Sequence, residues 1–287
     1  MTDIVPDRRT VLAGIGGFAV ASVAGPATAK ESGDARLDAL LSAQFEQGLR
    51  DDPTRATSLG IDTGVRAALR AQFPDWSPAA RAARTRQIDS DLAAVRAIKG
   101  ETLGDAARIA HDSAEFDLVT RQRLARFTYH TGGFGHRPGP YGVTQLGGFY
   151  TGVSTFLDSQ HPVTTKADAD AYMTRLQAIP TLLDADTEIV KANAAMGVVA
   201  PRFILDQALQ QLARLRDGDV GGKTLVASIA KRSAALGLSG YGESAAKVFE
   251  GPIRAALTRQ IDTLTALLPR AGTDAGVARL PDGAAYY

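Results

Sequence analysis

Residues 165–180 read TKADADAYMTRLQAIP, and this stretch decides the fold class. Tyr172, Leu176 and Ile179 recur at steps of four and three residues, which places them on one face of an α-helix. Thr165 stands just before this pattern, where a hydroxyl can accept a hydrogen bond from the first unpaired N–H groups of a helix. The stretch therefore predicts a helix that begins after Thr165 and buries one apolar face.

Helical spacing continues in both directions from this stretch, and the period-two alternation of strands is scarce between residues 33 and 269. Polar caps, prolines at first helical positions and closing glycines mark the ends of the segments. Further helices are expected at Leu37–Leu49, from Asp52-Pro53 to Gly60, from Ser77-Pro78 to Gly100, at about Asp105–Arg126, from Pro201 onward, and at about Glu243–Leu268 with a kink near Pro252. Pro180 is expected to interrupt its helix or to start a successor that ends at Gly197. The sequence predicts an all-α fold, a multi-helix array with little or no sheet.

One segment, residues 130–159, departs from the helical pattern because it combines eight glycines with five aromatic residues. It is too long for an ordinary connection between helices. Two interpretations stay open for this long Gly/aromatic-rich loop. It lines a functional cleft, or its aromatic side chains fill the core; the aromatics are Phe134, Tyr141, Phe149, Tyr150 and Phe156.

The composition excludes several classes of function. Lys and Arg number 32 against 31 for Asp and Glu, so no net field draws the 287-residue chain to nucleic acid, and no nucleic-acid partner is expected. The chain has no cysteine, which excludes disulfides, thiolate nucleophiles and thiolate metal ligands.

The N-terminus has the pattern of a twin-arginine export signal. Arg8 and Arg9 precede an uncharged, mildly apolar run, and Ala27 and Ala29 supply a small-x-small cleavage pattern. The alternative is a retained membrane anchor, but the glycines and the proline in the run argue against it. We expect residues 1–29 to be the signal and residues 30–287 to be one exported helical domain without a stable membrane anchor, periplasmic or extracellular.

The chain carries no self-sufficient catalytic motif. The His-Glu-x-x-His pattern of zinc peptidases is absent, and His111 with Glu115, one helical turn apart, is the nearest approach to a ligand pair. That pair is expected to be a solvated face or a structural hydrogen bond rather than a metal site. The glycine-rich stretches 218–224 and 237–241 each lack a required glycine of the phosphate loop and of the nucleophile elbow, so both are predicted to be turns.

Several stretches together resemble one known family: QLGG at 145–148, SQHPV at 159–163, DADAYMTRL at 168–176, IP at 179–180, AMGVVAPR at 195–202 and LPDGAAYY at 280–287. The chain resembles the bacterial exported family catalogued as domain of unknown function 885. The resemblance implies similarity to helical zinc metallopeptidases whose His-Glu-x-x-His helix lies in a C-terminal half. This chain stops at Tyr287, where the family's pattern runs on, so the resemblance implies an N-terminal half without metal ligands. Zinc is expected only where a C-terminal catalytic half is present, and no cofactor is expected in this chain.

No catalytic residue of the family can be carried over, but residues that line a substrate cleft can be. The candidates are Gln145, Tyr150, His161 and Arg202. His161 precedes a proline and a helix start, which also suits a structural turn. Arg202 could donate two hydrogen bonds to a peptide carboxylate, although an Arg at this place is more often a solvated charge.

Two functions remain open at this stage. The chain is either the non-catalytic N-terminal portion of an exported metallopeptidase-like protein that contributes a peptide-binding cleft, or a non-enzymatic helical binding or structural protein of the cell envelope. The partners expected are a peptide and a missing C-terminal half or partner chain. A half without its partner is also expected to expose apolar surface.

Overall fold

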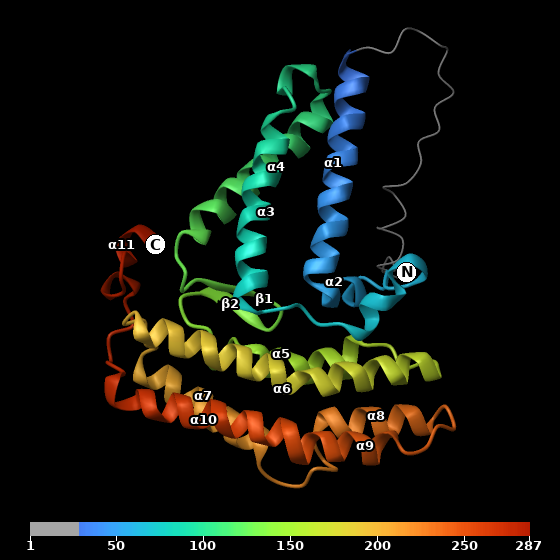
Figure 1. Ribbon diagram of the computed structural model, residues 1–287, viewed down its shortest axis with the longest axis vertical. Coiled ribbons are helices and arrows are strands. Elements are labelled where there is room, and N and C mark those ends of the chain that lie inside the picture. The colour runs from blue at the N-terminus through green and yellow to red at the C-terminus, as the bar shows by residue number, and fades with distance from the viewer. Residues whose placement is uncertain (1–28) are drawn as a thin grey trace, which may run out of the picture.

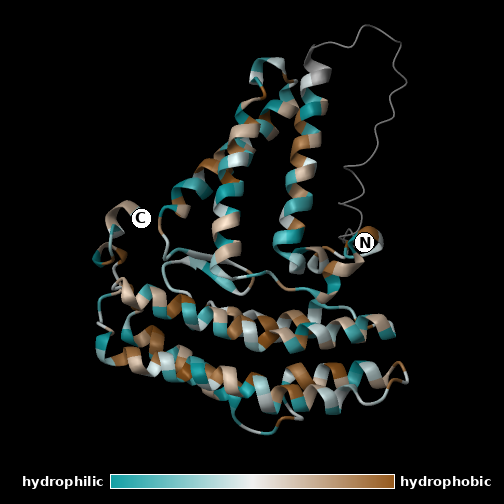
Figure 2. Ribbon diagram, in the orientation of Figure 1, coloured by the Kyte–Doolittle hydropathy of each residue, from teal (hydrophilic) through white to brown (hydrophobic). Residues whose placement is uncertain are grey.

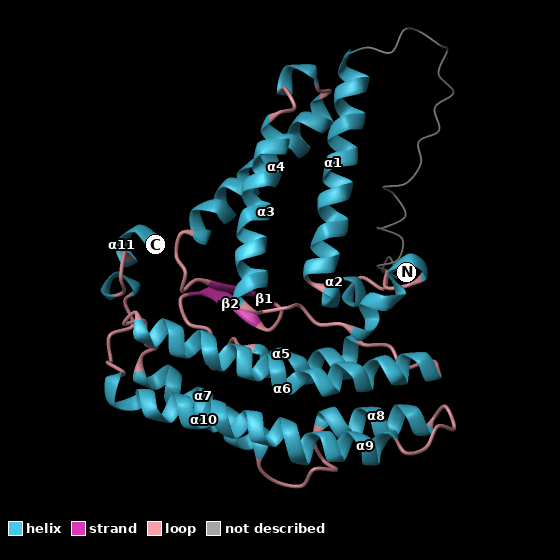
Figure 3. Ribbon diagram, viewed as in Figure 1, coloured by secondary structure: helices cyan, strands magenta, loops and turns pink. Residues whose placement is uncertain are grey.

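The computed structural model describes residues 29–287, and helices dominate this part of the chain (Figures 1 and 3). Its eleven described α-helices are α1 Ala29–Asp51, α2 Pro53–Ser58, α3 Pro78–Arg96, α4 Asp105–Ala125, α5 Phe149–Thr155, α6 Lys166–Ala195, α7 Arg202–Arg216, α8 Thr224–Ala234, α9 Tyr241–Val248, α10 Arg254–Leu267 and α11 Gly283–Tyr286. A two-stranded antiparallel hairpin, β1 Thr131–Gly133 and β2 His136–Gly139, is the one sheet in the described residues. The predicted all-α fold is confirmed. None of the helices described is both long and apolar enough to cross a membrane.

The helices form two groups that run in different directions (Figure 1). In that view α1, α3 and α4 stand upright, and α6 to α10 lie across their base. The main core lies in the second group, where buried residues include Leu176, Phe249 and Leu257. The upright helices are held by two small apolar clusters, one around Leu37 and one around Val95. Each long helix carries both hydrophobic and hydrophilic residues (Figure 2), as helices that bury one face require.

The predicted helix starts follow the local capping chemistry. The Thr165 hydroxyl accepts a hydrogen bond from the Asp168 N–H at 3.2 Å, and the Asp168 carboxylate accepts one from the Thr165 N–H at 2.9 Å. This reciprocal pair is a capping box. Asp52 caps α2 and Ser77 caps α3 in the expected way, by accepting from an N–H in the first turn.

Two expected helix boundaries are wrong. Helix α6 runs through Pro180 without interruption, because the buried side chains of Ile179, Leu182 and Leu183 outweigh the one backbone hydrogen bond that proline removes. Helix α3 ends at Arg96 rather than at Gly100. The last long helix starts at Tyr241, close to the expected Glu243, and a π-helical turn over Phe249–Ile253 lies at Pro252, where the kink was expected, and divides the helix into α9 and α10. The two glycine-rich stretches, 218–224 and 237–241, are interhelical turns as predicted.

The Gly/aromatic segment is not one irregular loop, because it contains the hairpin and α5. Its glycines make this possible: Gly133, Gly135 and Gly148 have φ of 111°, 76° and 130°, which other residues rarely adopt. A Cβ on Gly133 would also lie 2.4 Å from the Trp76 ring. Of the five aromatic residues, Phe149, Tyr150 and Phe156 are at most 5% exposed, and the other two are partly buried against the same core. The structure therefore favours the interpretation that they fill the core.

Candidate functional site

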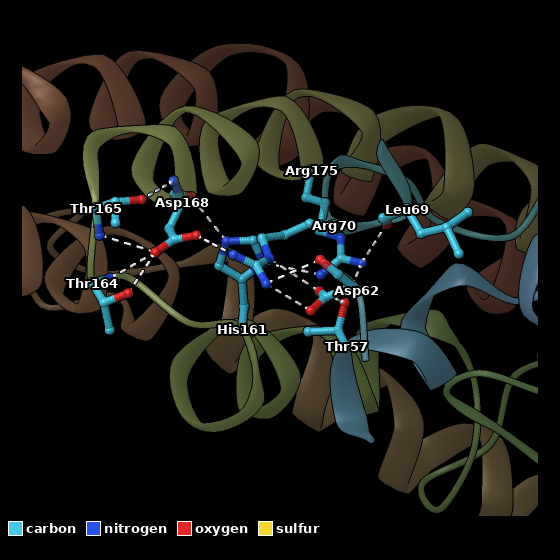
Figure 4. Close-up of polar contacts among 9 residues, drawn as sticks. All are labelled: Thr57, Asp62, Leu69, Arg70, His161, Thr164, Thr165, Asp168 and Arg175. Atoms are coloured by element: carbon cyan, nitrogen blue, oxygen red, sulfur yellow. Dashed lines mark hydrogen bonds and ion pairs between the residues drawn. The ribbon is translucent and has the colours of Figure 1, made fainter. Parts of the chain in front are cut away.

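Arg175 lies at the centre of a buried polar network between α6 and the segment that contains α2 and the 3₁₀ helix η2, Gly64–Ala71 (Figure 4). The residue is 0% exposed. Its guanidinium donates hydrogen bonds to Thr57 Oγ1 at 2.9 Å, Leu69 O at 3.1 Å, Gln72 O at 3.0 Å and His161 Nδ1 at 2.9 Å. Burial lowers the pKa of Arg175 to about 9, so the side chain stays protonated at neutral pH. These four bonds join segments that are far apart in the sequence.

A second arginine, Arg70, bridges two buried carboxylates of the same network. Its Nη2 donates to Asp62 Oδ1 at 2.8 Å, and its Nη1 donates to Asp168 Oδ1. Burial would raise the pKa of Asp168, but hydrogen bonds from Thr164 and Arg70 outweigh this effect and lower the pKa to about 2. Both carboxylates are therefore ionised at neutral pH and paired with Arg70.

His161 is fixed as a neutral imidazole. Its Nε2 lies 3.0 Å from the carbonyl oxygen of Asp168, which can only accept, and its Nδ1 lies 2.9 Å from an N–H of Arg175, which can only donate. The proton is therefore on Nε2. Burial lowers the pKa of His161 to about 4, with the nearby charge of Arg175 acting in the same direction. Both ring nitrogens are in use, so His161 has no free atom for acid–base or metal chemistry.

We expect the stability of the protein to decrease as the pH falls from about 6.5 to 4. The unfolded His161 binds a proton in this range and the folded one does not, which costs about 3 kcal/mol of unfolding free energy at pH 4. Urea denaturation at pH 7 and at pH 4 measures this loss. A His161→Gln variant lacks the group and should lose less over the same range; an equal loss in both proteins would contradict the assignment.

A second buried histidine, His136, has the opposite charge state. Its Nδ1 lies 3.1 Å from Phe134 O and its Nε2 lies 2.8 Å from Asp186 Oδ1, so both ring nitrogens donate and the ring is protonated. The other oxygen of Asp186 accepts from the Phe149 N–H at 2.7 Å. Burial works against the charge, but Asp186 outweighs it and raises the pKa of His136. This ion pair attaches the hairpin and α5 to α6.

A polar cleft of about 180 Å³ lies between α1 and α3, outside both buried networks. Two arginines, two aspartates and two glutamines line it together with two alanines: Gln47, Arg50, Asp51, Asp75, Ala80, Ala83, Arg84 and Gln87. The Arg84 guanidinium lies 5.2 Å from the centre of the Trp76 ring. The cleft is open to solvent and is lined by charged and amide side chains, so it is a better candidate for ligand binding than the fully paired networks.

The structure does not bring the four residues predicted to line a cleft together into one site. Gln145 is half-buried on the segment before α5, and Tyr150 lies in the main core, with its hydroxyl 2.8 Å from Gln211 Oε1. His161 belongs to the Arg175 network, and Arg202 is exposed, 3.7 Å from Asp206. No hydrogen bond joins any two of these four described residues. None of them lines the α1–α3 cleft.

His111 and Glu115, both on α4, have different hydrogen-bond partners. Buried His111 directs Nε2 at the carbonyl oxygen of Val95 at 3.1 Å, whereas Glu115 pairs with Arg96 at 2.7 Å. No three His, Cys, Asp or Glu side chains in residues 29–287 are grouped to hold a metal ion.

Of the predicted signal residues, Arg8, Arg9 and Ala27 lie outside the described residues, and Ala29 is the first residue of α1.

The exposed apolar residues expected of an incomplete protein lie on several elements. Ile109 and Phe116, 69% and 75% exposed, share the outer face of α4, and Phe203 on α7 is 50% exposed. None of these three residues lines the α1–α3 cleft.

The sequence contains a signal for the Arg175 network. Asp168 and Arg175 fall at the same helical spacing as Tyr172 and Ile179, on the apolar face of α6. Charged residues on a buried face must find partners inside the protein. The spacing does not identify the hydrogen-bond partners of these charged side chains, because the partners lie on α2 and η2.

The fold and the site define a helical scaffold. Its buried polar side chains are hydrogen-bonded to one another, and a small cleft lies at its surface. The sequence model of the family described as "Bacterial protein of unknown function (DUF885)" matches residues 53–287, and the chain belongs to this family. A solved structure, described as a "putative lipoprotein from Colwellia psychrerythraea", has the same fold with a TM-score of 0.69 and 16% sequence identity. The match covers 91% of this chain and 45% of the other, so this chain spans less than half of that protein's length. No curated protein matches the sequence.

Proposed function

We propose that this chain is the peptide-binding, non-catalytic portion of an exported envelope protein related to zinc metallopeptidases. The observation that carries the proposal is the α1–α3 cleft. Its lining offers two guanidinium groups, two carboxylates and two amides, which can pair with the charged ends and the backbone amides of a peptide. The net charge of this lining is zero, which suits a dipolar ligand better than a strongly charged one.

The chain's own residues do not fit a zinc site. Each of its four histidines has a ring nitrogen committed to a hydrogen bond, His130 with Tyr286 Oη at 2.6 Å among them. The three that are most buried have both ring nitrogens in use. In the proposal, zinc and the catalytic groups belong to a C-terminal half or a partner chain, and this portion positions the peptide. The longer lipoprotein with the same fold supports such an arrangement.

Export is part of the proposal and rests on Arg8 and Arg9. The Colwellia protein is described as a lipoprotein, which supports an envelope location for a protein that has the same fold as this chain. We expect that changing both arginines to lysine stops translocation of a fused reporter. Fractionation of the cells measures this, and a reporter exported as well as that of the parent would refute the twin-arginine assignment.

Peptide binding can be followed through Trp76, the single tryptophan of the chain, because it lies against Arg84 of the cleft. The full chain is titrated with a library of short peptides, with and without zinc. We expect saturable changes in Trp76 fluorescence and no hydrolysis in either condition. No binding by any peptide would refute the cleft as a peptide site. Stoichiometric zinc with cleavage would refute the non-catalytic assignment.

A further inference from the structure

Helix α4 exposes large apolar side chains on the face opposite to its packed face. The packed face contacts α1 and α3 through Ala107, Ala114 and Leu118. Ile109 and Phe116 lie on the opposite face, about two helical turns apart, and are 69% and 75% exposed. Large apolar residues in line on one side of a helix are the pattern by which a helix packs against another helix.

Charged residues extend this stripe at both ends of the helix. Asp105 in the first turn of α4 and Arg123 in the last turn are about five turns apart, so they lie in line with each other and beside Ile109 and Phe116. Both charged residues are exposed. Asp105 has one exposed contact with Arg108 at 3.3 Å. No carboxylate of the described residues lies within ion-pair distance of Arg123. The face therefore has an acidic end and a basic end, with the apolar pair between them.

Two copies of such a face complement each other when they pack antiparallel. A two-fold axis near Ser113 places the first turn of one α4 beside the last turn of the other. Asp105 of each copy then faces Arg123 of the other, and Ile109 packs beside Phe116. In a parallel pair Asp105 would instead face Asp105, and Arg123 would face Arg123. The charges therefore favour the antiparallel arrangement.

We infer that the outer face of α4 binds a second copy of this chain in an antiparallel, two-fold dimer. The charge complementarity of the face with itself identifies a second copy as its occupant. A contact through one helix of each copy is small, so we expect the dimer to exchange with the monomer. None of the residues that line the α1–α3 cleft lies on α4, so the inference does not rest on the proposed peptide site.

The test is sedimentation equilibrium of the full chain over a wide range of micromolar concentrations. We expect the average mass to rise from 30.1 kDa toward twice this value as the concentration increases. Phe116→Asp should weaken association by about tenfold or more, because each substitution acts at two places in the dimer. Phe203→Asp is the matched control, since Phe203 is 50% exposed on α7 and should not affect association. Far-UV circular dichroism confirms that each variant is folded.

Charge exchange tests the antiparallel arrangement. Asp105→Arg and Arg123→Asp each place like charges opposite each other at both ends of the dimer, and each should weaken association by about tenfold. A mixture of the two variants has opposite charges at both ends again, so it should associate as tightly as the parent. Asp112 lies on the same face near the two-fold axis, where its two copies approach each other. Asp112→Asn should therefore strengthen association.

Three results would overturn the inference: a parent that stays monomeric at every concentration, Phe116→Asp that associates like the parent, or loss of association in Phe203→Asp instead. If the mixture of the two charge variants stays monomeric, the antiparallel arrangement is wrong. An unchanged dissociation constant in Asp112→Asn would contradict an axis near Ser113.

Discussion

Replacing Arg175 with methionine is expected to lower the free energy of unfolding by about 4 kcal/mol. Methionine can occupy the space of the aliphatic part of the side chain but donates no hydrogen bond. The change leaves Leu69 O, Gln72 O and His161 Nδ1 without their donor, and the side chain that supplied it is 0% exposed. Urea denaturation at pH 7 gives the free energy of the parent and of the variant.

The control for this prediction is Arg259→Met. Arg259 pairs with Asp184 at 2.7 Å, as closely as the buried pairs, but both side chains are about half exposed. The loss there should be below about 1 kcal/mol, because solvent screens the pair and hydrates the partner that remains. Similar losses at Arg175 and Arg259 would contradict the conclusion that burial of the network determines its contribution.

The second large effect is expected at Asp186. Asp186→Asn should lower the free energy of unfolding by about 3 kcal/mol at pH 6, because it removes the charge that compensates buried His136. The size of the side chain is nearly unchanged, and the remaining oxygen can still accept from the Phe149 N–H. The variant therefore isolates the ion pair from the packing. Asp184→Asn, on the exposed pair of the same helix, is the matched control.

The effect of Asp186→Asn should depend on pH with a defined sign. The pKa of His136 is raised in the folded protein, so the pair stabilises the fold fully below the unfolded pKa of about 6.5. This stabilisation is lost as the pH rises through the folded pKa, and the difference between parent and variant should become smaller. Denaturation curves at pH 6 and at pH 9 measure the change. A difference that does not become smaller between pH 6 and pH 9 would contradict this pH dependence.

The helices could be predicted from the sequence because the interactions that start and stop them are local. Thr165 and Asp168 cap each other across three residues, and Tyr172, Leu176 and their neighbours repeat at the helical period. Where a boundary was wrong, as at Pro180, distant packing outweighed the local preference. The hairpin of residues 131–139 was missed because its strands are three and four residues long and rich in glycine, so no alternation is visible.

By itself, then, the sequence determined the fold class, the caps and the absence of a cysteine or of a peptidase motif, since these depend on composition and on residues a few positions apart. Only the tertiary structure decided which polar residues meet. Arg175 reaches Thr57 across 118 positions, Arg70 reaches Asp168 across 98, and the cleft at Arg84 exists because α1 and α3 pack side by side. Burial and partner choice are properties of the packed chain, and no local pattern encodes which distant acceptor a buried arginine will find.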